Sequence, residues 1–210
     1  MTDLCTTKRL AAISAFFGLF TGVLTSANAA TVRQVGFNEL VAGSEVVFHG
    51  QVTSVQSKIS PDRQSVHTQV EFQVFETIVG DYEGRLLKLT FPAGSADGLK
   101  VVINGLRIPE VGEEGVYFVE SVSQRLINPF YGWTQGQFLV LRDATGQSPR
   151  IMTADGAPVT RISATPTPYS VSISRGAALG VEFSRGGEIS TAMLLNDFGQ
   201  IIRETAEQSR

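Results

Sequence analysis

Apolar and polar residues alternate along the first half of the chain in the pattern of β-strands. From Val46 to Val55, and again from Val66 to Val74, most apolar residues occupy every second position. A period of two places successive side chains on opposite faces of a sheet, so each segment predicts a strand with one buried face. Between them, Ser60-Pro61-Asp62 predicts a turn, because proline fixes φ and aspartate bonds its own backbone. The pattern predicts an antiparallel meander.

Further strand signals follow in the next part of the chain. They lie at residues 86–91, 100–108, 116–119, 137–141 and 150–153. The apolar parity changes near Phe75, which predicts a bulge or a strong bend there. The uninterrupted apolar run at 116–119 predicts a strand that is covered on both faces. Together these signals predict an all-β domain over residues 30–160, an OB-like antiparallel barrel of about five to seven strands.

Helical signals flank the predicted strands. Phe37 to Ala42, followed by Gly43, predict a short N-terminal helix that leans on the barrel. Residues 161–189 are rich in glycine, proline and small polar residues and predict a flexible linker. Ser190 can cap a C-terminal amphipathic helix over 190–210. Its apolar face consists of Leu194, Leu195, Phe198, Ile201 and Ile202. Because this stripe is too large to leave in water, we expect it to dock on its own barrel in preference to a partner.

The first residues of the chain predict export. Lys8 and Arg9 precede an apolar run from Leu10 to Leu24, which is too short for a stable membrane span. Ala27-Asn28-Ala29 then offers the small residues that signal peptidase requires, so residues 1–29 are interpreted as a signal peptide. The alternative interpretation is a buried N-terminal helix. Export predicts a periplasmic or extracellular protein, with no stable membrane insertion after cleavage.

Composition narrows the classes of partner. The only cysteine, Cys5, lies in the segment that we expect to be removed, so packing alone must stabilise the mature chain. The formal net charge is −3, and loss of the signal segment makes the chain one unit more negative. This mild acidity argues against nucleic acid or an anionic membrane as the main partner.

Side chains suited to catalysis are few. His49 and His67 fall on the polar face of neighbouring predicted strands, where they either face solvent or approach each other and bind a metal without an evident third ligand. Glu110, Glu113 and Glu114 flank a glycine turn, where a carboxylate pair could act as in a glycosidase, although acids in turns are usually solvated. No familiar nucleophile, zinc or phosphate-loop motif occurs. The sequence therefore predicts no enzyme, no metal and no cofactor.

A glycine-broken aromatic segment from Phe130 to Phe138 is the strongest candidate binding surface. Aromatic side chains in such a loop can stack on a ligand or anchor a protein partner. The alternative is that they cap the open end of the barrel. We favour this alternative for Phe138, while both readings stay open for Tyr131 and Trp133. The candidate binding residues are Phe130, Tyr131, Trp133, Gln135 and Gln137.

Four segments resemble a group of exported bacterial proteins of unknown function. Residues 47–55, 70–80, 111–118 and 132–138 match a hydrophobic-x-Gly-x-Val strand, a Lys-Gly turn, a Gly-Glu-x turn and a Gly-x-x-Gln-Gly-x-Phe segment. Val79 stands where that group has lysine. Proteins of the group sometimes accompany secreted metallopeptidases. No activity is established for the group, so the resemblance implies an exported accessory protein of unknown function.

The order of strand signals is also similar, more distantly, to the netrin-like domain of tissue inhibitors of metalloproteinases, a five-stranded OB barrel. Those inhibitors chelate the protease zinc through an N-terminal cysteine, which a mature chain starting near Ala30 lacks. We therefore expect a non-enzymatic binding or accessory module whose partner is another exported protein, such as a peptidase. The alternative is a small-ligand or glycan binder that uses the loop Phe130–Trp133, and an enzyme of unknown class comes third.

Overall fold

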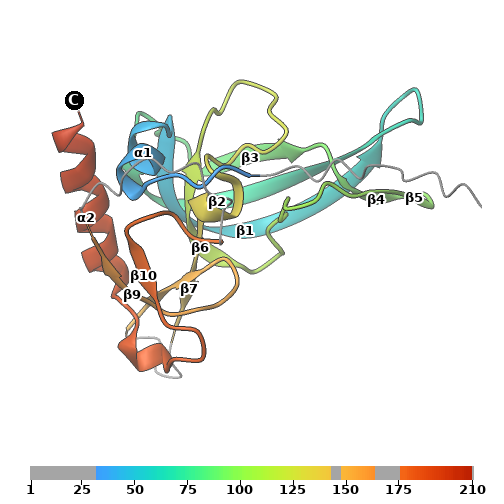
Figure 1. The fold of residues 1–210 in the computed structure, drawn as a ribbon. Coiled ribbons are helices and arrows are strands. Elements are labelled where there is room, and N and C mark those ends of the chain that lie inside the picture. The colour runs from blue at the N-terminus through green and yellow to red at the C-terminus, as the bar shows by residue number, and fades with distance from the viewer. Residues whose placement is uncertain (1–31, 143–147, 164–175, 210) are drawn as a thin grey trace, which may run out of the picture.

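The computed structural model describes residues 32–142, 148–163 and 176–209, so the predicted signal peptide lies outside the described residues. Within them, the main sheet has six antiparallel strands in the order β3-β2-β1-β6-β7-β8 (Figure 1). These strands are β1 (Val46–Ile59), β2 (Val66–Val79), β3 (Leu86–Phe91), β6 (Glu114–Val119), β7 (Gln137–Leu141) and β8 (Arg150–Thr153). Two small two-stranded sheets pair β4 (Gly94–Ala96) with β5 (Leu99–Val101), and β9 (Val159–Ile162) with β10 (Val181–Phe183).

The helical elements sit at the ends of the described chain and beside β7. They are α1 (Phe37–Ala42), α2 (Leu195–Gln208) and two short 3₁₀ helices, η1 (Trp133–Gly136) and η2 (Ile189–Thr191). No helix among the described residues has both the length and the apolar character needed to cross a membrane.

The long hairpin of β1 and β2 follows the alternation predicted for it. Its register slips where His49 pairs with Glu76 while the next residue, Gly50, pairs with Val74. Phe75 is the extra residue at this slip, which confirms the bulge predicted from the change of parity. Because a bulge re-aims the side chain outside the ladder, Phe75 is left 47% exposed.

Both faces of the sheet are buried around β1 and β6. One face packs against buried side chains of α1 and α2 and forms what we call the helix-side core, to which β6 contributes Val116 and Phe118. The opposite face carries a second hydrophobic core, which includes Phe48 and Phe72 and to which β6 contributes Tyr117 and Val119. All four β6 side chains are fully buried, so the prediction of a strand covered on both faces is confirmed.

The C-terminal helix α2 packs on the sheet beside α1 (Figure 1). The Phe198 ring lies 5.9 Å from the ring of Phe37 and 4.9 Å from that of Phe138, measured between centroids. Leu195 and Ile202 are buried with it in the helix-side core. The remaining stripe residues, Leu194 and Ile201, are partly buried. The apolar stripe is therefore covered by the chain's own sheet and α1.

The start of α2 differs from the expectation. The helix begins at Leu195 without a side-chain cap, and Ser190 lies in η2 instead. The Ser190 hydroxyl donates to the Glu188 carboxylate at 3.1 Å, so it serves a local turn rather than a helix N-terminus.

The sheet does not close into the expected OB-like barrel. Closure would require β3 and β8, the two edge strands, to hydrogen-bond to each other. The outer edge of β8 already has partners, because the Ile151 amide donates to the Met193 carbonyl and the Leu195 amide donates to the Pro149 carbonyl, each at 3.0 Å. The β-rich content and the two flanking helices are as expected, whereas barrel closure is wrong.

Two further segments differ from their sequence patterns. Of the strand predicted over 100–108, only residues 100 and 101 lie in a strand, at the end of β5 (Leu99–Val101). The predicted strand stops early because Asn104-Gly105 turns the chain, with Gly105 at a φ of 81°. Of the predicted linker, residues 164–175 lie outside the described residues. The part from 176 onward contributes β10 and the buried side chains of Ala177 and Ala178. Small residues suit close packing as well as a flexible linker, which explains the difference.

Candidate functional site

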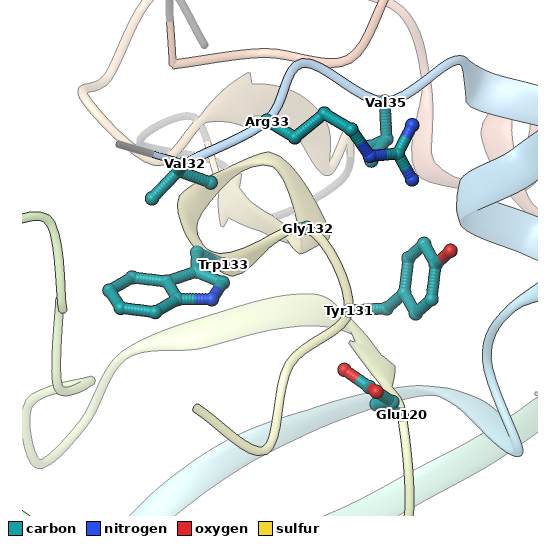
Figure 2. A pocket seen from close by; sticks show the side chains of 7 residues that line it. All are labelled: Val32, Arg33, Val35, Glu120, Tyr131, Gly132 and Trp133. Atoms are coloured by element: carbon teal, nitrogen blue, oxygen red, sulfur yellow. The ribbon is translucent and has the colours of Figure 1, made fainter. Parts of the chain in front are cut away.

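A pocket of about 320 Å³ lies where the chain before α1 meets the turn into η1 (Figure 2). Its lining comes from three separate parts of the sequence. The lining residues are Val32, Arg33, Val35, Glu120, Tyr131, Gly132 and Trp133. Figure 2 shows the rings of Tyr131 and Trp133 on two sides of the pocket, with the Glu120 carboxylate directed into the space between them.

The backbone at the pocket is held in an unusual conformation. Gly132 and Trp133 are both left-handed, with φ of 65° and 64°. Glycine takes this conformation freely, but for a bulky residue it costs about 1–3 kcal/mol. The turn is closed by the Trp133 amide, which donates to the Phe130 carbonyl at 3.1 Å. Contacts with the surrounding structure therefore offset the backbone strain at Trp133 and keep its indole at the pocket.

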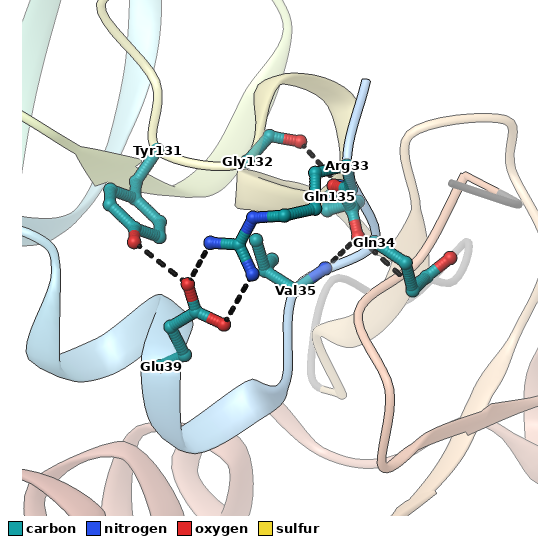
Figure 3. Close-up of polar contacts among 7 residues, drawn as sticks. All are labelled: Arg33, Gln34, Val35, Glu39, Tyr131, Gly132 and Gln135. Carbon is teal, nitrogen blue, oxygen red and sulfur yellow. Dashed lines mark hydrogen bonds and ion pairs between the residues drawn. The ribbon is translucent and has the colours of Figure 1, made fainter. Parts of the chain in front are cut away.

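The side chain of Gln135 holds the parts of this site together through hydrogen bonds (Figure 3). Its amide nitrogen donates to the carbonyls of Arg33 and Gly132, each at 2.9 Å. Its oxygen accepts from the Gln34 side chain at 2.9 Å and from the Val35 amide at 3.0 Å. The side chain is fully buried. Gln135 therefore joins the two walls of the pocket rather than presenting itself to a ligand.

Tyr131 and Arg33 are both bonded to one carboxylate, that of Glu39 on α1 (Figure 3). The Tyr131 hydroxyl donates to Glu39 at 3.1 Å, and Arg33 holds both oxygens of the same group. The bond from Arg33 lowers the pKa of Glu39, whereas burial, followed by the bond to Glu39, raises the pKa of Tyr131. Gly43 lies against the Tyr131 ring so closely that a Cβ there would overlap it. Tyr131 is thus fixed in place.

The other candidates from the aromatic segment are interior residues. Phe130 is fully buried in the second core, where its ring stacks on Tyr117 with centroids 5.4 Å apart. Gln137 is 1% exposed; it accepts from the Arg107 guanidinium at 3.0 Å and donates to the Arg107 carbonyl at 3.2 Å. Phe138 belongs to the helix-side core. Of the candidate binding residues, Tyr131 and Trp133 line the pocket, Gln135 bonds to its lining, and Phe130 and Gln137 are interior residues.

Arg33 and Glu120 are pocket residues that the sequence did not single out. Arg33 precedes α1 and Glu120 directly follows β6, so both are distant in sequence from the aromatic turn. Neither stands in a recognisable motif. The fold alone brings them to Tyr131 and Trp133.

His49 is buried instead of facing solvent. It is 8% exposed, and the ring of the bulged Phe75 covers it at a centroid distance of 5.1 Å. Its Nε2 lies 2.8 Å from the Glu114 carboxylate, which also accepts from Arg142 at 2.6 and 2.9 Å. Burial alone would raise the pKa of Glu114, but the bonds from Arg142 and His49 outweigh it and lower that pKa.

The two histidines are not brought together. His67 pairs across the hairpin with Lys58, many residues along β2 from the position opposite His49. Across the part of the chain that the structure describes, no three His, Cys, Asp or Glu side chains are grouped so that they could hold a metal ion.

The acids of the glycine turn form internal pairs. Glu113 accepts from Arg107 at 2.9 Å and from the Tyr117 hydroxyl at 3.2 Å. Glu114, on the opposite face of β6, is held by Arg142 and His49 as described above. The expectation of solvated acids is wrong for Glu113, which is held by residues nearby in the sequence, and for Glu114, whose partners come from distant segments. Glu110 is exposed, as expected.

Comparisons with protein-family models, with curated protein sequences and with solved structures find no match. We therefore infer the function from the contacts and charges of the chain's own residues.

Proposed function

We propose that this protein is an exported, non-enzymatic binding module that engages another exported protein through the pocket at Tyr131 and Trp133. The observation that carries the proposal is the indole of Trp133, held in a left-handed backbone conformation at an open pocket. Strained residues that the surrounding fold over-determines cluster at binding sites. Tryptophan and tyrosine are also the side chains most enriched among residues that dominate interface energies.

The acidic side chains around the fold favour binding over acid–base catalysis. Glu39 and Glu114 each accept bonds from an arginine, and the pKa of each is lowered. A general base works best when its pKa lies near the working pH. These two carboxylates are shifted in the opposite direction, so their role is to hold the structure together.

Export is proposed from the sequence of residues 1–29. The resemblance to exported bacterial proteins that accompany secreted metallopeptidases makes a peptidase our suggested partner. Intact-mass analysis of protein purified from its native host tests the first step. We expect a chain that begins at Ala30 or Thr31, and a mature protein that retains Cys5 would contradict export with cleavage.

The same pocket supports a second candidate, a small ligand or glycan. A sugar ring can stack on an exposed aromatic face, and the volume of about 320 Å³ lies at the lower end of the range for small-molecule sites. A bound sugar would raise the melting temperature by mass action.

Affinity capture from the extracytoplasmic fraction of the native host separates these functions. The bait proteins are the wild type, Trp133→Ala and the control Phe75→Ala, which removes another partly exposed aromatic ring outside the pocket. We expect one exported protein to be retained by the wild type and by Phe75→Ala but not by Trp133→Ala. Equal retention by Trp133→Ala would refute the proposal. Thermal stabilisation by a sugar, with no protein retained, would favour the glycan alternative.

A further inference from the structure

The charges that line the pocket do not cancel. Arg33 is neutralised, because its guanidinium holds both oxygens of Glu39. Glu120 is exposed, and its carboxylate forms no ion pair or hydrogen bond with the side chains of the described residues. The pocket therefore presents one uncompensated negative charge. The carboxylate lies near Tyr131 and points toward the space between Tyr131 and Trp133 (Figure 2).

The aromatic and aliphatic lining suits a cation with an apolar stem. The face of an indole attracts a cationic group more strongly than the other aromatic rings do, and a phenol ring adds to this attraction. Val32 and Val35 supply apolar surface at the same pocket. Lysine and arginine bury their methylene stems on such surface while the charged head stays near water.

We infer that the pocket receives a lysine or arginine side chain of the protein partner, with its cationic head at Glu120 and its stem against Trp133 and Val32. This inference rests on the proposed function and adds the chemistry of the occupant. An acidic side chain would meet Glu120 with the same charge, while the one cation in the lining, Arg33, is already committed to Glu39. A neutral side chain would leave the carboxylate without a partner.

Titration with small probes tests the occupant directly. The chain has one tryptophan, so intrinsic fluorescence reports on Trp133 itself. The probes are Nα-acetyl-lysine methylamide and its neutral counterpart, Nα-acetyl-norleucine methylamide, added to the full mature chain. We expect the lysine probe to bind about tenfold more tightly, which corresponds to about 1.4 kcal/mol and is the scale of one cation–π contact plus one exposed ion pair.

Two variants make this titration decisive. Glu120→Gln should abolish the preference for the lysine probe without changing the melting temperature, because the side chain is exposed. Asp81→Asn removes one exposed carboxylate from the β2–β3 turn and should retain the preference. Equal affinity of the wild type for both probes, or an unchanged preference in Glu120→Gln, would overturn the inference.

The capture experiment distinguishes failure of this inference from failure of the proposed function. A partner that is lost from Trp133→Ala but fully retained by Glu120→Gln overturns the basic occupant and leaves the binding function standing. Loss from both variants supports both steps. If the wild type retains no protein while the lysine probe still binds, the protein-partner function fails and the cation preference of the pocket stands.

Discussion

Replacing Gln135 by alanine should loosen the contact between the two walls of the pocket and lower the free energy of unfolding of the whole domain. The side chain is fully buried and makes four hydrogen bonds of 2.9–3.0 Å, which join the chain before α1 to the turn at Gly132. The variant leaves the Val35 amide and the Arg33 carbonyl without these partners. Both groups lie in the segment before α1, which Gln135 joins to the turn at Gly132.

The size of the effect follows from these bonds. Each neutral hydrogen bond contributes about 0.5–1.5 kcal/mol net, so four bonds bound the loss at about 2–6 kcal/mol. Gln34 keeps a second bond, to the Ala177 carbonyl, and water can reach the freed carbonyl of Gly132 at the open pocket. The loss should therefore fall at about 2–4 kcal/mol in the free energy of unfolding.

Equilibrium unfolding in urea, followed by far-ultraviolet circular dichroism, measures this loss. The neighbouring variant Thr134→Ala is the control, because its side chain is only half-buried; it should cost about 0.5 kcal/mol or less. Limited trypsin digestion adds a local readout, since cleavage after Arg33 should become faster in Gln135→Ala. A loss below about 1 kcal/mol, with unchanged cleavage at Arg33, would refute the reasoning.

Three further predictions concern other parts of the molecule. Trp133→Gly should be more stable than Trp133→Ala by about 0.5–1 kcal/mol in denaturant titration, because glycine accepts a positive φ without strain; the reverse order would show that this backbone is unstrained. Phe198→Ala should cost about 3–5 kcal/mol in the same assay, since the ring is fully buried against Phe37 and Phe138; a loss under about 1 kcal/mol would mean that α2 is not held by this face. For Glu114, the folded pKa is lowered, so its stabilising contribution is fully present above the unfolded pKa of about 4.3 and is lost as the pH falls through the lower folded value. The difference in unfolding free energy between the wild type and Glu114→Gln should therefore shrink below about pH 4.3, and a constant difference down to about pH 2 would contradict it.

The strands that the sequence predicted well are those whose signal is local. Alternation located the hairpin of β1 and β2 and the bulge at Phe75, and an uninterrupted apolar run located the doubly buried strand β6. Barrel closure is a different kind of property, because it depends on which segment occupies the outer edge of β8. The backbone of Met193 and Leu195 occupies this edge of β8. The pattern of side chains does not predict a backbone pairing between segments so far apart in the sequence.

The candidate site was predictable only in part, for a related reason. Aromatic residues in a glycine-broken turn pointed to Tyr131 and Trp133, because that combination is recognisable within a few residues. Polarity suggested a surface role for Gln135, yet a buried amide is stable when its hydrogen bonds are satisfied, and three of its four bonds here go to residues about 100 positions away. The charges of Arg33 and Glu120 reach the pocket through tertiary packing, which alternation cannot reveal.

Site-specific photo-crosslinking in the native host tests the central claim most directly, that the pocket at Trp133 is where this protein meets its partner. A photoreactive phenylalanine analogue would replace Trp133 in one variant and the exposed Phe75, outside that pocket, in another. We predict a crosslink to one exported protein from position 133 and none from position 75. A crosslink from position 75, with none from position 133, would contradict the claim.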